Sequence, residues 1–150
     1  ALQTAAPTAE HFGITPTTDD RLIESANFFE GKTFGVGDGS LRRPSVWVHL
    51  WNPFRPSWGE PYVDVAKRVA AAVADAREAA EGHEAVLVSH QLPIEVTRRF
   101  LTGETLWHRP DRRKCALASL TSIVYDGDRI ARVDYSEPAG DTGRKRVGGA

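Results

Sequence analysis

Apolar and polar positions alternate with helical spacing most clearly over residues 62–81. Apolar residues recur there every three or four positions, which is typical of one buried helix face. The apolar positions are Val65, Val69, Ala72, Val73 and Ala76. We assign most of the opposite, polar face to Lys67, Arg68, Asp75, Arg77 and Glu78. Gly82 follows, and a glycine at this point predicts the end of the helix.

A short, continuous apolar run over residues 85–89 comes directly after this helix. Its length and flanks predict a buried strand. Pro93 then predicts the opening of another helix that continues to about Leu101. Helix, strand, loop and helix in this order indicate an α/β layer fold with a parallel sheet.

The amino-terminal pattern predicts a helix over residues 1–12 that stops at Gly13. Pro7 lacks the N–H that a helix interior needs, so we expect a break or a kink near Ala6. Further along the chain, the aromatic and apolar residues 46–51 predict a short helix.

Near the carboxyl terminus, the strand-like runs 117–125 and 129–135 flank Asp126-Gly127, a hairpin signal. We expect an antiparallel edge hairpin on a mostly parallel sheet. Its second strand would place Ala131, Val133 and Tyr135 on one face.

Composition limits the class of protein. The chain has 150 residues, 41% of them hydrophobic and 26% charged, which suits a single globular domain. We place this domain at residues 1–138, followed by a disordered tail over 139–150. The formal net charge of −1 gives no electrostatic case for nucleic-acid binding. The single cysteine, Cys115, excludes an intramolecular disulfide. No apolar run approaches the roughly 20 residues of a membrane span, so we expect a cytoplasmic protein without membrane contact.

Two residues carry candidate chemistry. His90 follows the predicted strand 85–89 and precedes a helix, and ligands of open α/β sheets bind at the carboxyl ends of strands. The helix amino terminus there would favour an anion. From the pattern alone, a histidine that caps or fills a turn is equally well supported. Glu24 follows an apolar pair and could serve as a general acid, although most glutamates are simply solvated.

A basic cluster follows the second helix of this region. Arg109, Arg112, Arg113 and Lys114 lie beside Trp107 and His108. A phosphate-bearing substrate is one alternative, but we favour a surface loop. The histidines show no ligand spacing with a carboxylate or with Cys115, so we assign no metal.

Together these motifs make the chain resemble the histidine phosphatase superfamily, the phosphoglycerate-mutase-like group, in an actinobacterial-type branch. Ala1-Leu2-Gln3-Thr4-Ala5 resembles the tail of the family's Ser-Pro-Leu-x-Arg-Ala-x-x-Thr motif. Leu22-Ile23-Glu24, followed by Phe29-Glu30-Gly31, resembles the next motif. Val88-Ser89-His90 resembles the Val-x-His-Gly motif after a later strand.

The resemblance implies a three-layer α/β sandwich with a mostly parallel sheet, here without its first strand. It also implies phosphoric monoester hydrolysis through a phosphohistidine, with no metal or cofactor and a small phosphorylated substrate. Glu24 would be the proton donor and His90 the second histidine of the phosphate pocket. Gln91 stands where the family usually has glycine, so its amide would contact the substrate or fill space. Arg42 and Arg43 would contact the far end of the substrate, or form a solvated basic loop.

Two departures from the family pattern bear on activity. The chain contains no Arg-His-Gly triplet, and it begins one residue after the place of the family's next phosphate arginine. Methionine is also absent. We therefore expect an amino-terminally truncated chain that is inactive, or nearly so, by itself. A phosphomutase and a non-catalytic pseudophosphatase or interaction domain remain alternatives, and a homodimer is left open.

Overall fold

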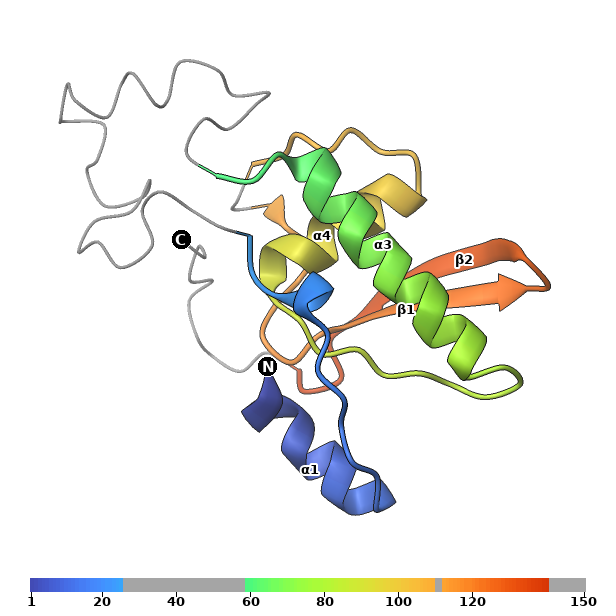
Figure 1. The fold of residues 1–150 in the computed structure, drawn as a ribbon. Helices are drawn as coiled ribbons and strands as arrows, with labels where there is room; N and C mark the ends of the chain where they lie inside the picture. Colours follow the sequence, from blue (N-terminus) through green and yellow to red (C-terminus); the bar gives the residue numbers. More distant parts are fainter. Residues whose placement is uncertain (26–58, 110–111, 141–150) are drawn as a thin grey trace, which may run out of the picture.

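The structure is a computed structural model that describes residues 1–25, 59–109 and 112–140. It combines helices with a carboxyl-terminal sheet (Figure 1). In chain order the elements are α1 (Leu2–Phe12), η1 (Asp20–Leu22), α3 (Tyr62–Ala79), α4 (Gln91–Leu101), β1 (Leu120–Asp126) and β2 (Arg129–Ser136). Several predictions lie outside the described residues: the helix over 46–51, Phe29-Glu30-Gly31, Arg42, Arg43 and most of the carboxyl-terminal tail.

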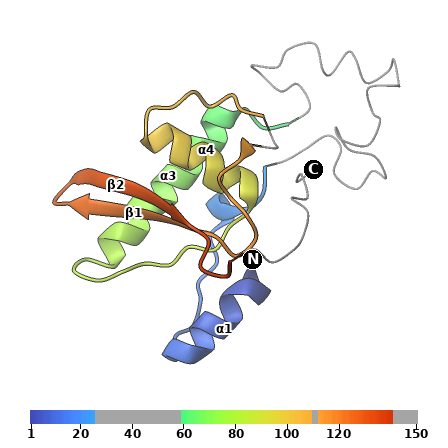
Figure 2. The ribbon, with the colours of Figure 1, turned by 180° about the vertical axis from the view of Figure 1, so that it is seen from behind.

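The hydrophobic core lies where α3 packs against α4. Both views of the ribbon show these helices side by side (Figures 1 and 2). Three apolar residues of α3 meet Val96 of α4, namely Val65, Ala66 and Val69. Leu22 and Tyr62 pack against this cluster from its edge. The apolar stripe predicted for residues 62–81 is therefore confirmed as the core face of α3.

The predicted amino-terminal helix and its end at Gly13 are confirmed, and only the predicted break is not found. α1 continues through Pro7 without a break and ends at Gly13, whose φ of 64° is left-handed. A proline removes one N–H from the ladder, here the partner of the Gln3 carbonyl one turn earlier. The loss of this one hydrogen bond in the middle of the helix does not end it.

The predicted hairpin is confirmed as the antiparallel pair β1–β2. Asp126 pairs with Arg129, so Gly127 and Asp128 form a two-residue turn. The register shifts at Val124 and Tyr125, and Ala131 is the unpaired residue of the bulge. Ala131 is consequently exposed, whereas Val133 and Tyr135 are half-buried on their predicted face.

The segment over residues 85–89 is not the buried strand that its composition predicts. It has no strand assignment, and Val86 is 71% exposed. A strand forms only beside a hydrogen-bonding neighbour, and β1 and β2 pair only with each other in the described part of the chain. The mostly parallel, layered sheet therefore stays a prediction.

Across the described ranges, no helix combines the length and the apolar character needed to cross a bilayer.

Candidate active site

The structure brings Glu24 and His90 together. Oε2 of Glu24 lies 4.0 Å from Nδ1 of His90, and their side chains are 45% and 41% exposed. Glu24 follows η1, and His90 is the residue that caps the amino terminus of α4. Oε1 of Glu24 also accepts a hydrogen bond from the backbone N–H of Ser25 at 3.0 Å. A carboxylate and an imidazole thus face each other at an accessible position.

Two side chains hold the segment that carries Glu24. The hydroxyl of Ser89 donates to the carbonyl of Leu22 at 2.7 Å. Nη1 of Arg68 donates to the carbonyl of Ile23 at 3.0 Å and to the carbonyl of Arg21. Arg68 also forms a bidentate ion pair with Glu60, with both N–O distances at 2.9 Å.

The sequence pattern does not reveal these contacts of Arg68. Its position on α3 was assigned to the polar face, but its side chain is only 19% exposed. Helical periodicity shows that a residue points away from the apolar stripe. It cannot show that a second segment covers that side of the helix.

The first turn of α4 brings partial positive charge to the site. The early N–H groups of any helix have no acceptor within the helix, and the helix dipole gives this end a partial positive charge. Pro93 occupies the third helical position, where the missing N–H costs nothing. The helix begins at Gln91, two residues before the predicted start. An anion beside His90 would therefore meet the amino terminus of α4.

Both polar atoms of the Gln91 side-chain amide form hydrogen bonds within the protein. Nε2 donates to the carbonyl of Cys115 at 2.8 Å, and Oε1 accepts from Nη1 of Arg113 at 3.2 Å. These contacts join the start of α4 to the segment that leads into β1. A substrate that uses the Gln91 amide would have to share it with these partners.

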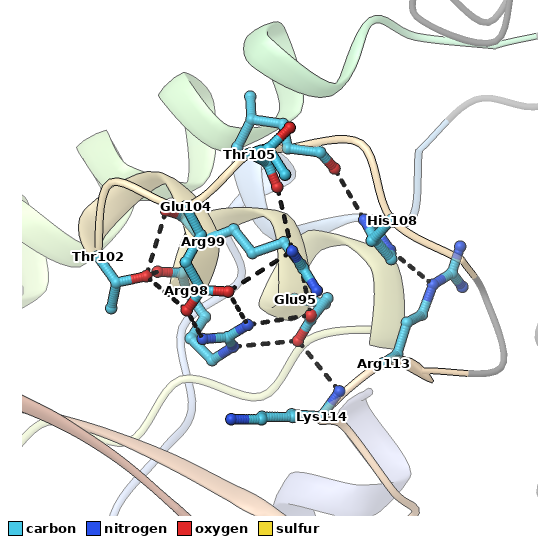
Figure 3. A network of polar contacts seen from close by, with 10 residues as sticks. Glu95, Arg98, Arg99, Thr102, Glu104, Thr105, His108, Arg113 and Lys114 are labelled. Atoms are coloured by element: carbon cyan, nitrogen blue, oxygen red, sulfur yellow. Dashed lines mark hydrogen bonds and ion pairs between the residues drawn. The ribbon is translucent and has the colours of Figure 1, made fainter.

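Arg113 in turn contacts His108, as Figure 3 shows. Nε of Arg113 donates to Nε2 of His108 at 3.1 Å, so Nδ1 carries the ring proton and donates to the carbonyl of Leu106 at 2.8 Å. Burial lowers the pKa of His108, which favours this neutral form. His108 is 7% exposed, whereas Arg109, Arg112 and Lys114 of the neighbouring basic cluster are exposed, as expected for a surface loop. The carbonyl of Leu106 and the guanidinium of Arg113 satisfy both ring nitrogens of His108 and so allow its burial. The local sequence pattern does not reveal these contacts.

α4 is also anchored by a buried carboxylate (Figure 3). Glu95 is fully buried and accepts hydrogen bonds from Arg98, Arg99 and the backbone N–H of Lys114. Burial alone would raise its pKa, but the two guanidinium groups hold the pKa of Glu95 below its usual range. The network fixes the helix that carries His90 against the segment before β1.

Other features lie away from these residues. A hollow of about 530 Å³ is lined by Pro61, Tyr62, Val63, Asp64, Thr105, Leu106 and Trp107, and thus by neither Glu24 nor His90. Within residues 1–25, 59–109 and 112–140, no group of three or more His, Cys, Asp or Glu side chains could hold a metal ion. Cys115 is buried, and burial raises the pKa of its thiol.

Comparison with known proteins supplies the family. The chain is 59% identical to the protein titled "Uncharacterized protein Rv0525" of Mycobacterium tuberculosis (strain H37Rv), over 93% of this chain and 69% of the relative. It is 58% identical to "Uncharacterized protein MT0547" of the same species (strain CDC 1551), with the same coverage of both chains. No solved structure matches the chain. Residues 1–137 match the family model for the histidine phosphatase superfamily (branch 1), so this chain belongs to that superfamily.

Proposed function

We propose that the complete protein hydrolyses phosphoric monoesters through a phosphohistidine intermediate. The observation that carries the proposal is the 4.0 Å approach of the Glu24 carboxylate to the His90 imidazole. Membership of the histidine phosphatase superfamily gives this pair its chemical context. The proposal concerns the complete protein, because residues 1–150 contain no Arg-His-Gly triplet to supply the nucleophile.

In the first step, a nitrogen of the nucleophilic histidine attacks phosphorus and the ester P–O bond breaks. Glu24, protonated at this stage, gives its proton to the leaving oxygen, so that an alcohol departs. In the second step, water attacks phosphorus and the P–N bond breaks. The Glu24 carboxylate takes a proton from this water, inorganic phosphate is released, and Glu24 is again protonated.

His90 and the amino terminus of α4 would bind the phosphoryl oxygens. His90 would donate a hydrogen bond from its ring, and the helix N–H groups and dipole would stabilise negative charge that develops in the transition state. Gln91 would orient this turn or contact the substrate, and Arg42 and Arg43 would contact the far end of the substrate. The proposal includes the three-layer, mostly parallel sheet of the family, a cytoplasmic location and no cofactor.

A series of aryl phosphates with leaving groups of different pKa tests the role of Glu24. Glu24→Gln in the complete protein should slow esters of poor leaving groups by about 100-fold or more, because they need the proton most. Esters of good leaving groups should lose much less. Glu10→Gln, an exposed change on α1, is the matched control and should leave both rates unchanged. Equal losses for all esters in Glu24→Gln would remove Glu24 from the acid role.

Binding of orthovanadate tests the role of His90. His90→Ala should weaken vanadate binding at least tenfold, whereas His83→Ala, at an exposed position, should not. Transfer of the phosphoryl group to a second substrate alcohol, rather than to water, would assign a phosphomutase instead. A complete wild-type protein that neither turns over phosphomonoesters nor binds vanadate would indicate the non-catalytic alternative.

A further inference from the structure

Three consecutive backbone carbonyls just before Glu24 are held by side chains from distant parts of the chain. Nη1 of Arg68 on α3 donates hydrogen bonds to the first and third, the carbonyls of Arg21 and Ile23. The hydroxyl of Ser89 donates to the second, the carbonyl of Leu22. The carbonyl of Ile23 belongs to the peptide bond that leads into Glu24. The backbone on the amino-terminal side of the carboxylate is therefore fixed at three successive points.

The guanidinium of Arg68 is itself held in one orientation. Its Nε and Nη2 form the two parallel hydrogen bonds with Glu60, each 2.9 Å long. Nη1 then points at the two carbonyls. This fork geometry is specific to arginine, because an ammonium group is a point charge without a fixed plane. At 19% exposure for Arg68 and 25% for Glu60, the pair lies largely out of solvent.

The arrangement differs from an ordinary helix-surface ion pair. Arg68 connects α3, residue 60 and residues 21–23, which are far apart in sequence. Ser89, which holds the middle carbonyl, directly precedes His90. The hydrogen bonds from Arg68 and Ser89 thus hold the segment that carries Glu24 beside the segment that carries His90.

We propose that Arg68 is a positioning residue that holds the Glu24 carboxylate against His90 for proton transfer to the leaving oxygen. This role rests on the proposed function of Glu24 as the general acid. Arg68 acts through the backbone of residues 21–23 and has no part in binding the phosphate. Its loss should therefore lower the rate of proton transfer and leave the substrate affinity unchanged.

The test compares Arg68→Gln and Arg68→Lys with a matched control, Arg77→Gln. Arg77 lies on the same helix and also donates to a backbone carbonyl and a carboxylate, those of Gly127 and Asp128, at the hairpin turn. Arg68→Gln in the complete protein should lower kcat for aryl phosphates of poor leaving groups by about 10- to 100-fold. The KM, and the rates with good leaving groups, should change less than about threefold. Arg68→Lys should restore only part of the loss, and Arg77→Gln should show no leaving-group dependence.

Two further measurements test whether Arg68 acts by positioning Glu24. Because Arg68 acts through Glu24, adding Arg68→Gln to Glu24→Gln should cause no further loss with poor leaving groups. Amide hydrogen exchange on the 150-residue chain should quicken at Ile23 and Ser25, whose N–H groups are hydrogen-bonded, in Arg68→Gln but not in Arg77→Gln. Unchanged exchange there, equal losses for all leaving groups, or additive losses in the double variant would overturn the positioning role while the proposed function stands. Leaving-group dependence absent from Glu24→Gln itself would overturn the acid role and the positioning role together.

Discussion

The hydroxyl of Ser89 donates to the carbonyl of Leu22 at 2.7 Å. This bond joins the residue before His90 to a residue two positions before Glu24. A single O–H group therefore connects the two segments that bring the candidate acid and the candidate phosphate ligand together.

Ser89→Ala should lower the free energy of unfolding by about 1 kcal/mol, because a part-buried carbonyl loses its donor. It should also lower the phosphomonoesterase rate of the complete protein. Ser119→Ala is the control, since the Ser119 hydroxyl donates to the carbonyl of Ala116 at the same 2.7 Å but within a local turn. Urea denaturation measures stability and aryl phosphate hydrolysis measures activity. Equal activity losses in both variants would contradict the link between Ser89 and the site.

Replacement of the buried carboxylate should be far more costly. Glu95→Gln leaves the guanidinium groups of Arg98 and Arg99, which are 7% and 14% exposed, without their buried counter-charge. We expect a loss of about 3 kcal/mol in the free energy of unfolding. Asp134→Asn breaks the exposed Arg132–Asp134 pair and should cost less than about 0.5 kcal/mol. Comparable losses in the two variants, measured by urea denaturation, would be inconsistent with the buried network.

Protonation of His108 should destabilise the folded chain. Burial lowers the pKa of the folded imidazole below the ordinary value of 6.5, so the unfolded state binds more protons. The positive charge of a protonated ring would also be repelled by Arg113 and Arg99. The nearby carboxylate of Glu95 would attract this charge and so oppose the repulsion. Stability should thus be complete above about pH 6.5 and fall as the pH drops below that value.

His108→Asn should weaken this pH dependence. Urea midpoints between pH 5 and pH 8 would then vary less in the variant than in the wild-type chain. His83→Asn, at an exposed position, serves as the control and should keep the wild-type pH profile. A wild-type profile in His108→Asn would show that this histidine does not govern the response.

Glu104 should contribute to acid sensitivity at lower pH. The hydrogen bond from Arg98 is the largest cause that lowers the pKa of Glu104 to about 2. Stability from this pair is therefore present above the ordinary glutamate pKa and lost as the pH falls toward 2. Glu104→Gln should flatten the stability profile below about pH 4.5, as circular dichroism of acid unfolding can measure. Retention of the wild-type profile by the variant would exclude this pair as a source of acid sensitivity.

Helix α3 and the hairpin turn could be predicted from the sequence, because they depend on local pattern. The state of residues 85–89 could not, because a strand depends on a neighbouring strand from another part of the chain. The periodicity of α3 and the Asp126-Gly127 turn gave correct elements, because spacing and turn chemistry are local properties. The run over 85–89 has strand composition, but a strand also needs a neighbour, which a local pattern cannot supply.

The candidate site divides in the same way. Glu24 and His90 were found through short motifs whose chemistry depends on residue type and order. Arg68 was assigned to a polar face and Arg113 to a surface loop, and the contacts of Arg68 with Ile23 and of Arg113 with Gln91 join segments that are distant in sequence. Only the folded arrangement shows that Arg68 reaches the backbone beside Glu24.

Detection of the phosphorylated intermediate tests the proposed phosphohistidine chemistry directly. The complete protein, wild type and His90→Ala, would be mixed with an aryl phosphate, quenched within one turnover and examined by intact-mass and peptide mass spectrometry. We expect wild type to gain one phosphoryl group on a histidine other than His90, and His90→Ala to gain it more slowly. Turnover without any phosphorylated histidine, or phosphorylation of His90 itself, would contradict the account.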